Sequence, residues 1–495
     1  MGNRNTKSMV LAVDIGASGG RAMLGTYDGN GIQIQEIHRF LNEPVTIMGT
    51  MYWDVLRLFH EIKQSLLKAK QYGTVESIAV DTWGVDFGLL DEDGRMLENP
   101  IHYRDGRTHG MIGEALKHIS KEELYSITGN QFMEINTLFQ LISLQEKRPD
   151  LLKRARRLLL MPDLFHYFLS GETVAEASAA STTQLFDAGR KSWSHALLQT
   201  LALPESLFCP IVPSGTVIGS LTAEICAELD LPAVKVIAVA GHDTQSALVA
   251  VPAVEEDFLF LSSGTWSLLG TELDQPVTDE TARKLNLTNE AAVGGKTSFL
   301  KNIIGLWLIQ ESRRQWQREG REYSFAALEE MAEESVPFGS FIDPDDPVFV
   351  PPGNIPGRIR DYCRRTGQPV PEDEAAIVRC INESLAMKYR CAAADIRRCT
   401  GKEYQTMYLV GGGAQSRQLC QMTANSCQCG VSAGPAEATA LGNIAVQLIA
   451  LGNIKDLKQV RKLIRESTEI RLYRPEDLTP WDEAFKRFRQ VTGCV

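Results

Sequence analysis

Asp243 is the residue of this chain best placed to act as a general base. It follows the strongly apolar segment 234–240 and precedes a predicted helix that runs through Ala250. A carboxylate beyond a buried strand lies where ligands meet α/β sheets, and a general base contributes roughly 10² to 10⁴ in rate. A helix N-cap without a catalytic role is the alternative reading of Asp243. We expect His242 to bind or orient substrate hydroxyls rather than to act as the base.

Two segments far apart in the chain, 10–27 and 258–273, are built alike. Each consists of an apolar strand, a turn of glycine with serine or threonine, and a second strand. The tip of such a hairpin offers backbone N–H groups and hydroxyls to an anion. We therefore predict that the two tips bind a polyphosphate. An ordinary polar turn is the alternative at each tip.

Residues around these tips have the side chains that phosphoryl transfer to an alcohol requires, namely groups for the phosphates, a metal ion and a base. Asp14, just before the first turn, is placed to reach a hydrated Mg²⁺, which favours carboxylate oxygens and keeps several waters. Arg21 is predicted to neutralise charge on the transferred phosphoryl group. In the second hairpin, Gly264 and Thr265 are predicted to contact a β- or γ-phosphate.

A third glycine-rich turn, 411–415, follows the predicted strand 405–410. It does not have the spacing of a dinucleotide-binding fingerprint, and the chain has no P-loop motif. Its glycines would let a nucleoside or an α-phosphate approach bare backbone. We expect Gly412 to contribute to such a site.

Several polar and aromatic residues are further candidates for sugar binding. Trp83 offers a ring face and Asp86 a hydrogen-bond acceptor, although a buried tryptophan and a turn aspartate explain them equally well. Asn302 and Gln310 fall in a predicted helix, 300–318, and are candidates for ligand contacts.

The elements that must position these residues indicate an α/β protein of two lobes. Apolar periodicity predicts helices over 53–71, 121–128 and 138–147 and a strand over 75–81 in the first half of the chain. The proline-marked acidic segment 252–257 predicts a boundary, so we expect an N-terminal lobe over 1–252. A second lobe over 253–450 would include helices over 372–399 and 437–451, and residues 451–495 would pack back as helices.

Composition narrows the class of function. The chain has 495 residues, 44% of them hydrophobic, and a net charge of −11, which indicates a globular protein and argues against nucleic acid or an anionic membrane as a partner. No apolar run is long enough to span a membrane, and the first eight residues have no signal-peptide core. The ten cysteines include no Cys-x-x-Cys pair, so we expect free thiols and a cytoplasmic protein. The candidates for metal or redox chemistry are Cys427 with Cys429, and Cys363 with Cys380, whose pairing in a disulfide stays open.

The ordered motifs together resemble the FGGY carbohydrate kinases over nearly the whole chain. The motifs that carry this resemblance are VDIGAS (13–18), YWD (52–54), VDTWGVDFG (80–88), HYRDGR (102–107), MPDLF (161–165), STTQL (181–185), HDT (242–244), SSGTWSL (262–268), KNIIGLW (301–307) and GPAEATALGN (434–443). Within the family, they are most similar to the kinases that act on L-rhamnulose.

The resemblance implies a two-lobed actin- and hexokinase-like (ribonuclease H-like) α/β fold with ATP and Mg²⁺ in the cleft between the lobes. It also implies transfer of the γ-phosphoryl group of ATP to the 1-hydroxyl of the ketose L-rhamnulose, with Asp243 as the proton acceptor. The implied ATP-binding residues are Ala17, Ser18, Gly19, Gly20, Arg21, Thr265, Gln310 and Gly412. The implied sugar-binding residues are Gly84, His242, Asp243, Thr244 and Asn302.

The chain departs from the family pattern at a few positions. Gly19 and Gly241 stand where the family usually has serine, which removes a hydroxyl from the first turn and could change how Asp243 is oriented. Alternative substrates are L-fuculose, L-xylulose or another ketose, since a few contacts decide such specificity. A sugar- or ATP-binding protein without catalytic activity is the alternative from another class. The oligomeric state stays open.

Overall fold

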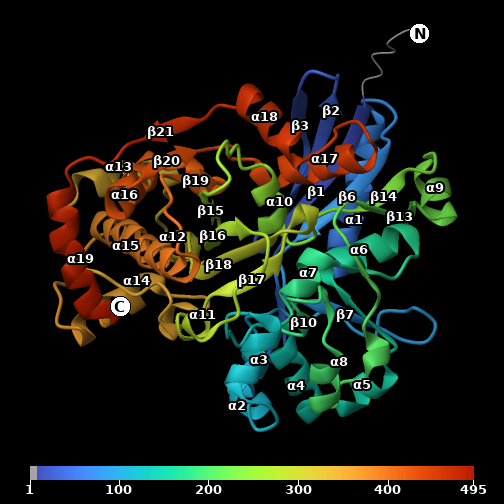
Figure 1. Ribbon diagram of the computed structural model, residues 1–495, viewed down its shortest axis with the longest axis horizontal. Coiled ribbons are helices and arrows are strands. Elements are labelled where there is room, and N and C mark those ends of the chain that lie inside the picture. The colour runs from blue at the N-terminus through green and yellow to red at the C-terminus, as the bar shows by residue number, and fades with distance from the viewer. Residues whose placement is uncertain (1–7, 495) are drawn as a thin grey trace. The chain divides into compact units, whose positions relative to one another are not determined.

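The computed structural model describes residues 8–494, which form two compact units (Figure 1). Unit 1 comprises Met1–Pro252, Glu272–Phe299 and Ala438–Ser467, and unit 2 comprises Ala253–Thr271, Leu300–Glu437 and Thr468–Val495. The chain passes from unit 1 to unit 2 after Pro252, and residues 272–299 and 438–467 belong to unit 1. The prediction that the N-terminus carries no signal-peptide core concerns residues 1–7, which lie outside the described residues.

Unit 1 is built on a six-stranded sheet of order β13-β14-β6-β1-β2-β3. Its strands are β1 (Ser8–Gly16), β2 (Gly19–Tyr27), β3 (Ile32–Leu41), β6 (Ser77–Thr82), β13 (Thr216–Ser220) and β14 (Lys235–Ala238). β1, β6 and β14 run parallel, while the remaining pairs are antiparallel. β6 is buried throughout, as expected for a parallel strand covered on both faces.

Helices cover the strands of this sheet. α10 (Asp243–Val249) and α17 (Ala438–Ala450) pack against β1 and β6, α1 (Val55–Lys70) packs against β1 and β3, and α6 (Met161–Ser170) packs against β6 and β14. α10 and α17 also pack on one another. The side-chain amide of Gln447 on α17 reaches the strands: its Nε2 donates to the carbonyl of Leu11 at 3.0 Å, and its Oε1 accepts from the Ser77 hydroxyl at 2.7 Å. These contacts place 438–467 in unit 1.

The rest of unit 1 consists of short elements. The helices are α2 (Met111–Ala115), α3 (Lys121–Thr128), α4 (Thr137–Lys147), α5 (Pro149–Arg154), α7 (Ala177–Ser181), α8 (His195–Thr200), α9 (Ala223–Leu229), α11 (Glu280–Lys284) and α18 (Leu457–Ser467). The strands are β4 (Val45–Ile47), β5 (Thr50–Tyr52), β7 (Phe87–Leu90), β8 (Arg157–Leu160), β9 (Ala175–Glu176), β10 (Phe186–Asp187), β11 (Ser192–Trp193), β12 (Ile211–Val212) and β17 (Thr288–Ala291).

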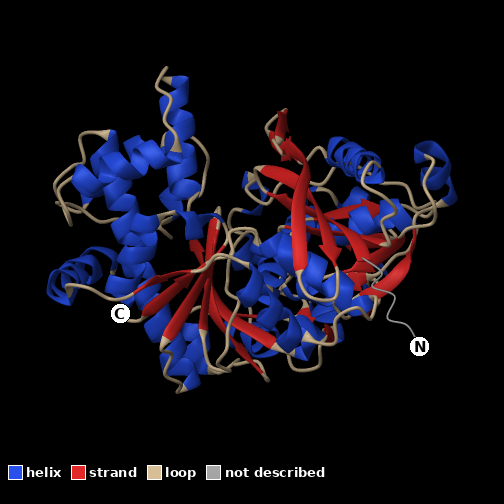
Figure 2. Cartoon of the chain, turned by 90° about the horizontal axis from the view of Figure 1, so that it is seen from above, coloured by secondary structure: helices blue, strands red, loops and turns tan. Residues whose placement is uncertain are grey.

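The second large sheet repeats the topology of the first. β15 (Leu259–Ser263) pairs antiparallel with β16 (Trp266–Leu273) and parallel with β19 (Thr406–Val410); β19 is parallel to β20 (Gly430–Ala433), and β21 (Arg471–Tyr473) is antiparallel to β20. The full order is β17-β18-β16-β15-β19-β20-β21, with β18 at Thr297–Ile304. Figure 2 shows both sheets among their helices. The two similar hairpins of the sequence are therefore equivalent elements of two repeated sheets.

The helices of unit 2 are α12 (Trp307–Arg318), α13 (Phe325–Glu334), α14 (Ile355–Arg365), α15 (Glu374–Thr400), α16 (Arg417–Cys427) and α19 (Leu478–Thr492). α15 packs against α12, α13, α16 and α19. The predicted helix 300–318 is wrong in its first turns, because 300–304 belong to β18 and the helix begins at Trp307. The C-terminal residues include β21 as well as helices.

The cysteine prediction also needs correction. Cys391 of α15 and Cys494, which follows α19, form a disulfide, although we predicted free thiols and considered only Cys363 and Cys380 as a possible pair. Cys363 and Cys380 are free and buried. Composition could not indicate this pairing because folding alone brings together two positions 103 residues apart. Within 8–494, no helix combines the length and apolar character needed to cross a membrane.

Candidate functional site

Three carboxylates lie at the carboxyl ends of the parallel strands of unit 1. Asp14 on β1 is in register with Asp81 on β6. Asp243 is the first residue of α10, which follows β14. The backbone N–H of Thr82 donates to the carbonyl of Gly241 at 2.9 Å, so the chain entering α10 runs beside the end of β6. This edge of an α/β sheet is where ligands bind.

Asp14 and Arg21 face one another across the β1–β2 hairpin. Both Nε and Nη2 of Arg21 donate to Oδ2 of Asp14 at 3.1 Å. The turn between the strands is held from β3, because Asn42 Nδ2 donates to the carbonyl of Gly16 at 2.8 Å. The structure therefore joins the predicted phosphate and metal residues at one hairpin tip, and it adds Asn42 as a support that sequence reasoning missed.

Two glycines of this turn have different surroundings. A Cβ on Gly20 would lie 2.3 Å from the ring of Phe40, whereas one on Gly19 would lie 3.1 Å from the carbonyl oxygen of Phe40. Gly20 is thus required by packing. A Cβ on Gly19 would also be crowded, but less than one on Gly20. The close approach of β3 therefore accounts for glycine at position 19, where the family usually has serine.

Asp81 is fully buried, and Asn443 of α17 donates its Nδ2 hydrogen to Oδ2 at 2.6 Å. Oδ1 of Asp81 has no hydrogen-bond partner among the described residues. Burial and the nearby carboxylate of Asp14 raise the pKa of Asp81 well above its ordinary value. Sequence reasoning did not assign a role to either residue.

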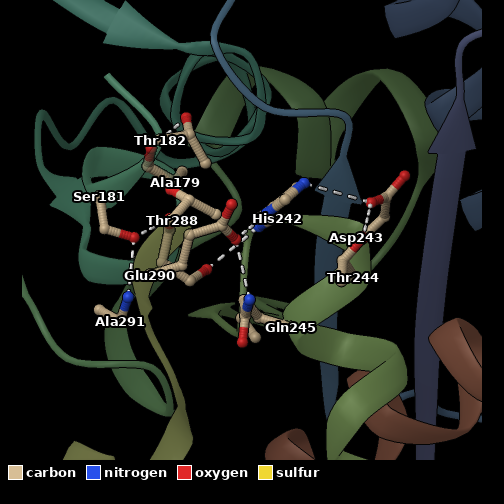
Figure 3. A network of polar contacts seen from close by, with 12 residues as sticks. Ala179, Ser181, Thr182, His242, Asp243, Thr244, Gln245, Thr288, Glu290 and Ala291 are labelled. Atoms are coloured by element: carbon tan, nitrogen blue, oxygen red, sulfur yellow. Dashed lines mark hydrogen bonds and ion pairs between the residues drawn. The ribbon is translucent and has the colours of Figure 1, made fainter. Parts of the chain in front are cut away.

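His242 lies between two carboxylates (Figure 3). Its Nδ1 is 2.8 Å from Oε2 of Glu290, and its Nε2 is 3.6 Å from Oδ1 of Asp243. Gln245, one turn further along α10, also donates to Oε2 of Glu290, at 2.8 Å. Burial lowers the pKa of His242, but the charge and hydrogen bond of Glu290 outweigh it and raise that pKa to about 9. The ring is therefore a cation at neutral pH.

Asp243 is accessible to a substrate, since 31% of its side chain is exposed. Removal from water raises its pKa above the ordinary value; the carboxylate of Asp14 acts in the same direction, and His242 opposes both. His242, not Asp243, occupies the N-cap position of α10. The reading of Asp243 as a helix cap is therefore wrong, while an accessible carboxylate of raised basicity suits proton transfer.

Gly84 and Gly241 are explained by packing. A Cβ on Gly241 would lie 2.8 Å from Pro162 Cγ and 3.1 Å from Oε2 of Glu176, the oxygen that accepts the N–H of Gly241 at 2.9 Å. A Cβ on Gly84 would lie 3.0 Å from Thr182 Cγ2. Glycine at 241 thus lets buried Glu176 hold the chain just before Asp243.

Trp83 and Asp86 are not available to a sugar. Trp83 is buried, and Oδ2 of Asp86 accepts hydrogen bonds from the indole N–H groups of Trp53 and Trp83 at 2.6 and 3.0 Å. The other oxygen accepts from Gln140 at 2.9 Å. Burial raises the pKa of Asp86 to about 6 despite these donors. The alternative interpretation of Trp83 and Asp86, a buried tryptophan and a turn aspartate without a role in sugar binding, is therefore correct.

In unit 2, the second hairpin tip is fixed to the start of α12. The N–H groups of Gly305 and Trp307 donate to the carbonyl of Thr265 at 3.1 and 3.2 Å, and the hydroxyl of Thr265 donates to Oε1 of Gln310 at 3.2 Å. Two predicted nucleotide residues thus lie together although they are distant in sequence.

The third glycine-rich turn packs against the same tip. Cβ atoms on Gly411 and Gly413 would lie 3.0 Å from the carbonyl oxygen and 2.1 Å from Oγ of Ser263, respectively. A Cβ on Gly412 would meet nothing closer than 4.0 Å, and Gly412 is exposed. Only Gly412 of the three is free of a packing requirement, so it alone can offer bare backbone to a ligand.

The residues predicted to bind ATP or the sugar are distributed over both units. Ala17–Arg21, Gly84 and 242–244 belong to unit 1, whereas Asn302, Thr265, Gln310 and Gly412 belong to unit 2. Asn302 lies on β18 and not on a helix. Within 8–494, no group of three or more histidine, cysteine, aspartate or glutamate side chains could hold a metal ion.

Comparison with known proteins relates both halves of the chain to one family. Residues 9–250 match the N-terminal domain, and residues 259–451 the C-terminal domain, of the FGGY family of carbohydrate kinases. The chain is 42% identical over 490 residues to the rhamnulokinase of Bacteroides thetaiotaomicron, covering 99% of this chain and 100% of that protein. It is 43% identical to the rhamnulokinase of Enterococcus faecalis, covering 96% of both chains.

Solved structures share the fold at lower identity. A ligand-bound xylulose kinase from Lactobacillus acidophilus has a TM-score of 0.79 at 17% identity, covering 98% of this chain and 97% of that one. Plasmodium falciparum glycerol kinase with ADP has a TM-score of 0.76 at 15% identity, with the same coverage. These matches confirm the predicted two-domain α/β fold.

Proposed function

The chain belongs to the FGGY family of carbohydrate kinases, and from this premise we propose that it transfers the γ-phosphoryl group of ATP to the 1-hydroxyl of L-rhamnulose. The observation that carries the proposal is the identity of about 42% with proteins named rhamnulokinase over nearly their whole length. The products are L-rhamnulose 1-phosphate and ADP.

In this proposal Asp243 accepts the proton of the sugar hydroxyl as that oxygen attacks the γ-phosphorus. The exposure and raised pKa of its carboxylate suit the role, because a base works best when its pKa approaches the working pH. Arg21, at the first hairpin tip, would offset negative charge on the transferred group. His242, Thr244 and Gly84 would contact the sugar from unit 1, and Asn302 from unit 2.

The carboxylates of unit 1 fit a Mg²⁺ ion. This ion takes one or two carboxylates and fills its other positions with water and phosphate oxygens. Asp14 would hold it through water, and Asp81 Oδ1, which lacks a partner among the described residues, lies on the adjacent strand in register with Asp14. Bound there, the ion would neutralise phosphate charge. It would also counter the mutual repulsion of the two carboxylates.

Thr265 and Gln310 of unit 2 are proposed to bind the nucleotide, as are Ala17–Arg21 of unit 1. Thr265→Val removes the hydroxyl and keeps the shape of the side chain. We expect it to raise the KM for ATP about 2- to 10-fold, which is the effect expected from the loss of one hydrogen bond. The KM for the sugar should change less. Steady-state kinetics with each substrate varied in turn measures both, and Thr265→Ser is the control that keeps the hydroxyl. Equal effects on both constants would contradict a nucleotide role.

Gly412 and Gly413 give a second test of the nucleotide site with matched substitutions. Gly412→Ala should fold normally and raise the KM for ATP, because its Cβ would occupy space open to a ligand. Gly413→Ala should lower the free energy of unfolding by about 1 to 3 kcal/mol through overpacking against Ser263. Urea unfolding and ATP kinetics separate the two effects. An unchanged KM in Gly412→Ala would remove Gly412 from the site.

Coupled measurement of ADP formation with a panel of ketoses tests the substrate. We expect the highest kcat/KM with L-rhamnulose, and phosphate on carbon 1 by NMR of the product. Higher kcat/KM with L-fuculose or L-xylulose would keep the kinase and change the sugar. Sugar-dependent protection against heat without ADP formation from any ketose would instead indicate a binding protein.

A further inference from the structure

We propose that Glu290 is a positioning residue for phosphoryl transfer: it holds His242 as a cation whose Nε2 faces the carboxylate of Asp243. The proposal rests on the proposed kinase function, and it concerns a residue outside every motif that carries the family resemblance. Glu290 lies on β17, about 50 residues after Asp243. It reaches the site only through the fold.

Contacts from several elements fix the orientation of the His242 ring. Glu290 is 4% exposed, and its Oε2 is 2.8 Å from His242 Nδ1. The N–H of His242 donates to the hydroxyl of Ser178 at 3.1 Å, which anchors the backbone. Gln245 donates to the same Oε2, so the carboxylate is itself held in place. With Nδ1 committed to Glu290, only Nε2 faces Asp243 (Figure 3).

The charges around the ring favour its protonated form. Three carboxylates face His242 from different elements: Glu290 on β17, Asp243 on α10 and Glu176 on β9. Of these, Glu290 makes the short hydrogen bond, and Asp243 lies at 3.6 Å from the opposite ring nitrogen. A protonated ring donates from both nitrogens. It can therefore bond to Glu290 and still present a positive N–H to Asp243.

The positive charge of His242 affects the protonation state of Asp243. Asp243 is partly removed from water and feels the negative charge of Asp14, and both conditions favour its protonated form, which cannot accept a proton. A positive His242 counters them and keeps Asp243 ionised. Loss of the Glu290 charge would make the buried ring neutral and remove that support. The effect of Glu290 thus passes through His242 to the residue that takes the hydroxyl proton.

The test compares Glu290→Gln with Glu290→Ala. Glutamine keeps an oxygen that accepts from Nδ1–H but lacks the charge, whereas alanine removes both. We expect kcat to fall about tenfold in Glu290→Gln and further in Glu290→Ala, with the KM for ATP within about twofold of the parent. Glu383→Gln is the matched control: Glu383 is a fully buried carboxylate of α15 that pairs with Arg379 at 2.6 Å. It should leave kcat unchanged.

A spectroscopic measurement separates positioning from a purely structural role. In protein labelled with ¹⁵N-histidine, the ring nitrogens report protonation directly, and the His242→Asn variant assigns the His242 signals among eight histidines. At pH 7.5 we expect both nitrogens of His242 to be protonated in the parent protein and only one in Glu290→Gln. A structural role alone would leave this pattern unchanged while lowering the unfolding temperature.

Parent-like kcat in Glu290→Gln, or a ring that stays doubly protonated in that variant, would overturn the proposal. The same holds if kcat falls equally in Glu383→Gln. Absence of ADP formation from every ketose by the parent protein would refute the kinase function instead, and the NMR comparison would still decide whether Glu290 sets the charge of His242.

Discussion

Replacing Asp243 with asparagine is expected to lower kcat by roughly 10² to 10⁴, the contribution of a general base, with little change in the KM for either substrate. Asparagine has nearly the same shape but cannot accept the hydroxyl proton. The fold should persist, because His242 and not Asp243 occupies the N-cap position of α10. Coupled measurement of ADP formation with L-rhamnulose gives kcat, and thermal unfolding checks the fold.

Asp150→Asn is the control for this change. Asp150 also lies in the first turn of a helix, α5, and 68% of its side chain is exposed. The control should keep the parent rate. Full activity in Asp243→Asn would exclude Asp243 as the base, and His242, the other titratable group at the start of α10, would then be tested by His242→Gln.

Local pattern was sufficient to predict the parts of the site that lie next to one another in sequence. The hairpin 10–27 is an apolar strand, a glycine turn and a second strand, and the structure confirms it as β1 and β2. Its partner in unit 2 is confirmed as β15 and β16. Asp243 was predicted at the end of a buried strand for the same reason. Such features depend on a few neighbouring residues, so a sequence carries them directly.

Other parts of the site depend on segments that only folding brings together. Glu290 reaches His242 from β17, and Asn443 reaches Asp81 from α17. No local pattern marks either residue as functional, since an acid in a strand or an amide in a helix is ordinary. Trp83 and Asp86 show the opposite error: they have suitable chemistry but their polar atoms are used within the core.

The predicted helix 300–318 is confirmed over Trp307–Arg318, but its first turns are wrong for a third reason. Its first residues, Leu300–Ile304, mix one leucine and two adjacent isoleucines with Lys301 and Asn302, so helical periodicity and a buried strand explain them equally well. Tertiary pairing decides, because these residues form β18 beside β16. Gly305 then ends the strand where a Cβ would lie 2.5 Å from Oγ of Ser267. The close approach that requires this glycine cannot be inferred from spacing.

Gly442→Ala is expected to destabilise the protein by about 3 kcal/mol or more, at or above the upper end of the usual cost of overpacking. A Cβ on Gly442 of α17 would lie 1.7 Å from the carbonyl oxygen of Ser246 on α10. That atom belongs to the backbone and cannot rotate away, so one of the two helices must move. Urea unfolding should show a lower midpoint. Because α10 begins with Asp243, kcat should fall as well.

Gly113→Ala is the matched control, since Gly113 lies in α2 and its Cβ would meet nothing within 4 Å. There the substitution should be neutral or stabilising by up to about 1 kcal/mol, the difference in helix propensity between the two residues. Equal stability of the two variants would contradict the close packing of α17 on α10. A Gly442→Ala variant of parent-like stability but reduced kcat would instead mean that α10 moves to make room for the new methyl group. The contact between Gly442 and α10 would then set the position of Asp243.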